Sequence, residues 1–166
     1  MDFNFSLIPN DIFREIAISE IIERNEKTVE YGLILTKEAA SELVQTRTNE
    51  LTNTGRVEFG GATIQNIIDA FYDSPYINQY NYAQTLHELI EIFYYYKNET
   101  LDIISDNNLI YYMKSYFNGS CQGSLELLKN RELDELARKV RFSDFHFSEP
   151  NDISEFYYEV DYDEWE

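Results

Sequence analysis

The stretch His87-Glu88-Leu89-Ile90-Glu91 contains the first residues with possible chemistry. A zinc metalloprotease helix carries His-Glu-x-x-His, in which two imidazoles bind the metal and the Glu acts as base. Here Glu91 stands at the second His position, so His87 and Glu91 could offer one nitrogen and one oxygen from one helix face. The only other histidine is His146, and no third ligand lies nearby in the sequence. We read His87 as a structural residue, with metal binding or acid–base chemistry by His87, Glu88 and Glu91 as the alternative.

Cys121 lies between Gly119 and Gly123, directly before a predicted helix. A helix N-terminus lowers a thiol pKa, but a catalytic thiol also needs a histidine close in space. Two histidines give few chances for that, so we expect an inert cysteine and keep a catalytic thiol as the alternative. Because Cys121 is the only cysteine, no intramolecular disulfide is possible, which favours a reducing compartment.

Other catalytic and cofactor motifs are missing from the sequence. Gly60-Gly61 precedes a helix, but a P-loop needs Lys and Ser/Thr after its glycines, and Ala62-Thr63 follows here. We interpret the two glycines as a turn and predict no cofactor and no metal.

The charge excludes some classes of partner. The 166 residues contain 13 Lys and Arg against 31 Asp and Glu, which gives a net charge of −18. Such a surface repels nucleic acid and anionic membranes alike. A protein partner is possible, and the oligomeric state is not predictable. The N-terminal residues lack the charge and apolar core of a signal peptide, and no apolar run is long enough for a membrane helix, so we expect a cytoplasmic protein.

The composition changes at Phe142. Residues 142–166 contain nine acidic and eight aromatic residues and no Lys or Arg. Tyrosine and tryptophan give large contact areas at protein interfaces. The candidate partner-binding residues are Phe156, Tyr158, Tyr162 and Trp165. Alternatively, this segment docks on its own domain, because five basic residues lie within residues 129–141, immediately before it.

Apolar residues at helical spacing dominate the rest of the chain. They predict helices that start near Asn10, after Thr36, after Gly61, after Asn81, at Asp106 and at Ser124. Asn81 with Gln84 is typical of a capping box variant, and a kink or a break is expected at Asn130. Three short pieces alternate with period two instead: residues 3–7, 56–59 and 156–162. We therefore predict a mainly α, compact single domain of about six helices, with a possible small β element formed by the terminal segments.

Several blocks of sequence resemble a known family. They are Arg56 to Gly61, Asp73 to Ile77, Leu86 to Thr100, Gly119 to Leu128 and Arg131 to Leu133. Together they resemble a family of uncharacterised proteins of about this length from clostridia and related Firmicutes, over roughly residues 20–141. The resemblance implies a bacterial cytoplasmic setting and carries no known activity, ligand or catalytic residue.

These observations divide the chain into a helical domain at residues 1–141 and an acidic, aromatic-rich segment at 142–166. The function they favour is a non-enzymatic protein-interaction or regulatory module. The alternative is a metal-binding protein or small enzyme that uses His87, Glu88 and Glu91.

Overall fold

The computed structural model describes residues 10–142, and the side chains from Ile12 onward. Helix accounts for 73% of what it describes. The helices are α1 (Asn10–Glu23), α2 (Asn25–Thr28), α3 (Lys37–Thr54), α4 (Ala62–Phe71), α5 (Tyr82–Glu99), α6 (Asp106–Asn118), α7 (Leu125–Leu127) and α8 (Leu133–Phe142). Six of these have ten or more residues, which confirms the predicted mainly α domain of about six helices.

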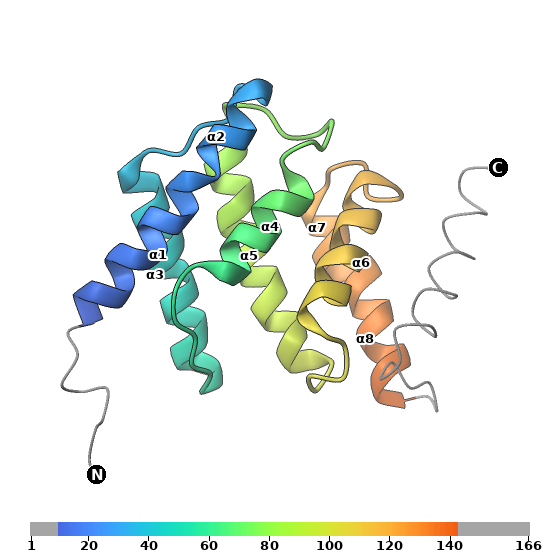
Figure 1. Ribbon diagram of the computed structural model, residues 1–166. Helices are drawn as coiled ribbons and strands as arrows, with labels where there is room; N and C mark the ends of the chain where they lie inside the picture. The colour runs from blue at the N-terminus through green and yellow to red at the C-terminus, as the bar shows by residue number, and fades with distance from the viewer. Residues whose placement is uncertain (1–9, 143–166) are drawn as a thin grey trace, which may run out of the picture.

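Helix α5 is the central element (Figure 1). On one side, α3 packs along it, and α1 packs against α3 and α4. On the other side lie α6, α7 and α8, and α4 connects the two sides through contacts with α1, α5 and α6. Within residues 10–142, no helix is long and apolar enough to cross a membrane.

Apolar residues at helical spacing predict one buried stripe on α5, and this stripe forms the middle of the core. All five of its residues are buried: Tyr82, Leu86, Leu89, Ile90 and Phe93. In the C-terminal half of α5, Ile92, Tyr94, Tyr96 and Lys97 are buried as well. Burial on several faces is the pattern expected of a helix surrounded by others.

Several predicted helix boundaries are confirmed. The Thr36 hydroxyl accepts a hydrogen bond from the Ala39 amide at 3.0 Å and so caps α3. Gly55 ends α3 in the left-handed conformation, with φ at +70°. The kink expected at Asn130 is a five-residue π-helical turn, Leu128–Glu132, between α7 and α8.

Three predictions about local structure are wrong. Residues 56–59 form an irregular segment, and no strand occurs between residues 10 and 142, because no second extended segment there pairs with them. The Asn81 side chain makes no cap on α5, because its Oδ1 accepts from the Asn78 amide and Gln84 binds Glu88 instead. The spacing of Ile12, Phe13, Ile16, Ala17 and Ile21 predicts one buried face on α1, but Ile12 and Ile16 are 50% and 45% exposed. The terminal segments 3–7 and 156–162 lie outside the described residues.

Candidate functional site

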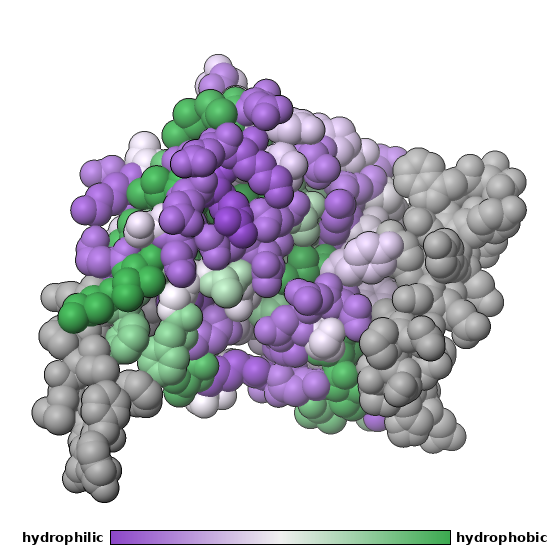
Figure 2. Space-filling view, viewed as in Figure 1, coloured by the Kyte–Doolittle hydropathy of each residue, from purple (hydrophilic) through white to green (hydrophobic). Residues whose placement is uncertain are grey.

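A groove of about 470 Å³ lies between the start of α1, the second half of α3 and the segment that joins α3 to α4. We call it the α1–α3 groove. It is lined by Phe13, Arg14, Val44, Gln45, Arg47, Thr48, Leu51, Thr52, Arg56, Val57, Glu58 and Phe59. Figure 2 shows apolar surface gathered at the lower left of the molecule, over the start of α1 and the end of α3. Three arginines and several large apolar side chains therefore line the same groove.

The segment Arg56-Val57-Glu58-Phe59 has a reversed polarity: its charged side chains face the domain and its apolar side chains face solvent, the opposite of an ordinary surface segment. Its charged side chains are turned toward the domain, with 23% and 24% of the Arg56 and Glu58 side chains exposed. Val57 and Phe59 are instead 74% and 49% exposed. This segment is the wall of the α1–α3 groove, and it contributes two exposed apolar side chains beside its two partnered charged ones.

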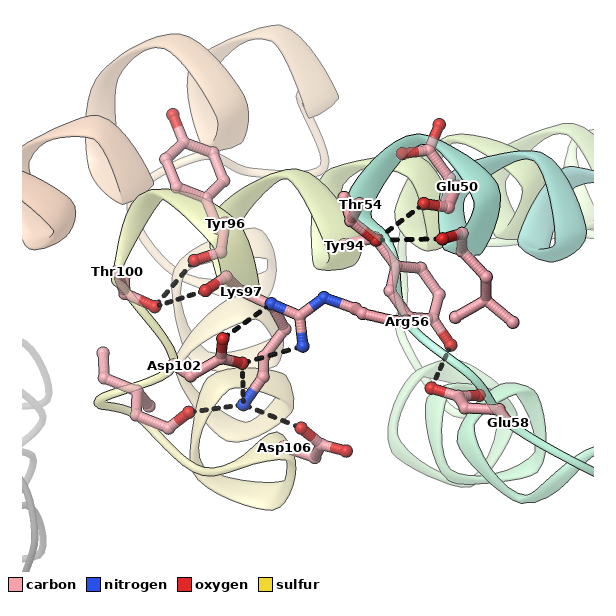
Figure 3. A network of polar contacts seen from close by, with 12 residues as sticks. Glu50, Thr54, Arg56, Glu58, Tyr94, Tyr96, Lys97, Thr100, Asp102 and Asp106 are labelled. Carbon is pink, nitrogen blue, oxygen red and sulfur yellow. Dashed lines mark hydrogen bonds and ion pairs between the residues drawn. The ribbon is translucent and has the colours of Figure 1, made fainter.

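Hydrogen bonds hold the charged residues of this segment in place. The Arg56 guanidinium binds both carboxylate oxygens of Asp102 at 2.8 Å (Figure 3). This bond is the main reason why the pKa of Asp102 is lowered. The hydroxyl of Tyr94 donates to Glu58 at 2.7 Å, and burial raises the pKa of Tyr94 far above its ordinary value.

Lys97 connects this wall to the turn between α5 and α6. Its ammonium group donates to the carbonyl oxygen of Ile104 at 2.7 Å and lies 2.8 Å from Asp106 and 3.7 Å from Asp102 (Figure 3). Only 8% of the Lys97 side chain is exposed. Asp102 thus forms ion pairs with two cations, Arg56 of the groove wall and Lys97 of α5.

Arg47 forms the floor of the groove, with 5% of the residue exposed. Its Nη1 donates to the carbonyl oxygen of Gly60 and lies 3.8 Å from Glu58. Its Nε is buried and has no hydrogen-bond partner among the described residues. A buried guanidinium with an unused donor favours an acceptor from outside.

Within the described residues, Arg14 is the arginine of the groove whose hydrogen-bond partners are all neutral. Its guanidinium donates to the Ser41 hydroxyl at 2.6 Å, and to the Ser41 carbonyl and the Gln45 amide oxygen at 3.2 Å each. No carboxylate within residues 12–142 forms an ion pair with it, whereas Arg47 lies beside Glu58 and Arg56 pairs with Asp102. A carboxylate that enters the groove would find this cation available.

His87 lies on α5 beside α3, with 38% of its side chain exposed. Its Nδ1 is 2.8 Å from the Thr46 hydroxyl, which itself donates to the Glu42 carbonyl. The Thr46 hydroxyl therefore links the His87 ring to the backbone of α3. Nε2 then faces Glu91 at 3.5 Å.

The other members of the predicted His87 site are not all brought together. Glu88 accepts a hydrogen bond from Gln84 at 3.1 Å rather than facing Glu91. A cavity of about 170 Å³ beside His87 is lined by Ala39, Glu42, Leu43, Ala83 and Gln84. Among residues 12–142, no group of three or more His, Cys, Asp and Glu could hold a metal ion. His146 lies outside the described residues.

Cys121 is buried between α6 and α7, with 2% of the residue exposed. Burial raises the pKa of its thiol to about 11, and Glu132 adds to the shift. The neutral thiol is therefore the stable form at neutral pH. The predicted partner-binding residues Phe156, Tyr158, Tyr162 and Trp165 lie outside the described residues.

The sequence reasoning did not identify the three arginines of the groove. Arg14 and Arg47 come from different helices, and nothing in their local sequence marks them. The alternation of polar and apolar residues at 56–59 did mark this segment as unusual, but we interpreted it as a strand. In the structure, this alternation instead places exposed apolar residues between charged residues that have partners.

Comparison with known proteins identifies one family. A model described as "Family of unknown function (DUF6323)" matches residues 20–145. No curated protein and no solved structure matches the chain.

Proposed function

We propose that this chain, which belongs to the DUF6323 family of unknown function, is a non-enzymatic protein-interaction module of a bacterial cytoplasm, as in clostridia and related Firmicutes. Its α1–α3 groove binds a segment of a partner protein that carries aromatic and acidic residues. The observation that carries this proposal is the reversed polarity of residues 56–59 beside Arg14, a cation with no carboxylate partner within residues 12–142.

The exposed apolar residues of the groove and its cation Arg14 would favour the binding of such a segment. Burying the exposed parts of Val57 and Phe59 under a partner would contribute roughly 1–2 kcal/mol each. A carboxylate on Arg14 would add a charge-assisted hydrogen bond, which is stronger than the neutral bonds present now. Residues 10–142 contain 21 Asp and Glu against 13 Lys and Arg, so most of the remaining surface disfavours an acidic segment.

Photo-crosslinking in the native host tests the proposal. A benzoylphenylalanine replaces Phe59 in the groove, and a matched control replaces Tyr80, which is 88% exposed in the segment before α5. We expect position 59, and not position 80, to form an adduct with another protein. Mass spectrometry should map the adduct to a peptide with aromatic and acidic residues.

A second variant tests whether the crosslinked adduct depends on the groove. Arg14→Glu reverses the charge that would meet the partner carboxylate, while a glutamate near the start of α1 suits the helix dipole. The adduct should be lost in Arg14→Glu and kept in Lys37→Glu, whose lysine side chain is 67% exposed on α3. No intermolecular adduct at position 59, or an adduct unaffected by Arg14→Glu, would contradict the proposal.

A further inference from the structure

We propose that Asn118 is a site of slow self-modification: its side-chain amide is lost, and the turn that buries Cys121 opens irreversibly. Asn118 is the last residue of α6, and Gly119 follows it directly. This is the only Asn-Gly pair in the sequence. An asparagine cyclises most readily when glycine follows it, because glycine has no side chain to hinder the approach of its backbone nitrogen. None of these three residues lines the α1–α3 groove, so the site is independent of the proposed function.

The modification needs only the chain itself and water. The backbone nitrogen of Gly119 attacks Cγ of Asn118 and gives up its proton, the Cγ–Nδ2 bond breaks, and ammonia leaves with that proton. A succinimide ring remains. Water then opens the ring at one of its two carbonyl groups, which gives either aspartate or isoaspartate. In isoaspartate the main chain runs through Cβ and Cγ, so the backbone gains one carbon atom.

The fold restrains both reacting groups. The Gly119 amide, which has to attack, donates a hydrogen bond to the Ser115 carbonyl at 3.0 Å. The Oδ1 of Asn118 accepts a hydrogen bond from the hydroxyl of Ser74 at 2.6 Å, and only 5% of Ser74 is exposed. Asn118 also has to leave its helical ψ before Cγ can meet the Gly119 nitrogen. The last turn of α6 must therefore open before the ring forms, and helix ends are among the parts of a fold that open most easily.

The turn after α6 cannot keep its hydrogen bonds once isoaspartate has formed. The Cys121 amide donates to the Tyr116 carbonyl at 2.9 Å, and the Gly123 amide donates to the Phe117 carbonyl at 2.8 Å. Both bonds close loops that contain the modified linkage, so the extra carbon lengthens both loops. Gly123 has little room to shift, because a Cβ at this position would lie 2.6 Å from the Tyr76 side chain. The turn therefore opens rather than adjusts.

Loss of this turn changes the chemistry of Cys121. Only 2% of the residue is exposed, and it packs in the hydrophobic core. An open turn gives water and reagents access to the thiol, and access is one of the conditions for a reactive cysteine. The modified chain therefore carries a reactive thiol where the unmodified chain carries an inert one. Refolding cannot remove the extra backbone carbon, so the change is permanent.

Incubation of the purified full-length protein at mildly alkaline pH tests the first step. Mass spectrometry of the peptide that contains Asn118 follows the loss of the amide, and chromatography separates aspartate from isoaspartate. We expect the folded protein to react at least about tenfold more slowly than the protein in urea, because only the open state reacts. Ser74→Ala should raise the rate in the folded protein about fivefold, which is the effect of losing one ordinary hydrogen bond. Ser105→Ala, at the opposite end of α6, is the matched control and should leave the rate unchanged.

The Cys121 thiol tests the second step. The isoaspartate form should react with a disulfide reagent in the absence of denaturant. Asn118→Asp, which has the charge of the product but no extra backbone carbon, should keep Cys121 unreactive. Asn118→Gln should abolish both the modification and the gain in thiol reactivity, because its longer side chain closes a ring less readily. Far-UV circular dichroism checks that each variant stays folded.

Several results would overturn the proposal. One is an Asn118 that stays unmodified in the folded protein, and another is a rate in the folded protein equal to the rate in urea. The same conclusion follows if Ser74→Ala and Ser105→Ala change the rate alike, or if Cys121 stays unreactive in the isoaspartate form. The comparison of folded and unfolded wild-type protein needs no variant, so it decides the first step even if Ser74→Ala does not fold.

Discussion

Replacing Lys97 should lower the free energy of unfolding, because Lys97 bonds the turn after α5, to which the groove wall is attached through Asp102. The Lys97 ammonium is the hydrogen-bond donor to the carbonyl of Ile104, a residue with no exposed surface. Lys97→Met keeps a side chain of similar length but leaves that carbonyl without its donor, which costs about 1–3 kcal/mol. The carboxylates of Asp102 and Asp106 are more than half exposed, so losing their ion pairs adds only about 0–1 kcal/mol.

Lys97→Ala removes the buried stem as well as the donor. Its three lost methylene groups contribute about 0.8 kcal/mol each, so we expect Ala to cost roughly 2 kcal/mol more than Met. Urea unfolding, followed by the circular dichroism of the helices, gives both free energies of unfolding. Lys37→Met is the control, because its lysine side chain is 67% exposed, and should stay within about 0.5 kcal/mol of wild type.

Two results would refute this reasoning. If Lys97→Met is as stable as wild type, the hydrogen bond to Ile104 contributes nothing and the charge is dispensable, as happens when apolar residues replace some buried ion pairs. If Met and Ala are equally destabilised, the stem of Lys97 does not pack against the core. Either result would mean that the turn after α5 is held by other contacts.

Three further predictions concern residues outside the groove or at its edge. The Cys121 thiol, with a pKa of about 11 and 2% exposure, should react with a disulfide reagent at pH 8 at least about a hundredfold more slowly in native protein than in urea. Gly123→Ala should destabilise by more than about 2 kcal/mol, since a Cβ there would lie 2.6 Å from the Tyr76 Cβ at φ +84°. Gly32→Ala, at φ +76° in open space, should cost only about 1 kcal/mol, and urea unfolding measures both glycine variants. The lowered pKa of Asp102 adds stability that is complete above about pH 5 and is lost as the pH falls through that lowered value, so Asp102→Asn should flatten the fall of Tm below about pH 4.

The helices were predictable because their signal is local. In α4, the spacing of Ile64, Ile67, Ile68 and Phe71 places all four on one face, and all four are fully buried. That geometry does not depend on which element covers the face. The same is true of Thr36, whose hydroxyl caps a helix through a bond only three residues long.

The groove was not predictable, because its contacts join distant residues. Arg14 meets Gln45 across 31 positions, and Arg56 meets Asp102 across 46. The alternation at residues 56–59 fixes only that successive side chains point to opposite sides. Which side faces the domain depends on Asp102 and Tyr94, which are far away in the sequence.

The reversed polarity of residues 56–59 bears on function because it is not needed to join α3 to α4. A connecting segment is more stable when its apolar residues face inward and its charges face water. A single exposed apolar residue is ordinary on any protein surface. Here Val57 and Phe59 are exposed beside a groove, and Ile12 and Ile16 are exposed within one turn of its Phe13. Arg56 and Glu58 form bonds that hold the wall, whereas Arg14 has no carboxylate partner in the part of the chain that the structure describes. These exposed apolar groups are the observation on which the proposed binding of a partner segment depends.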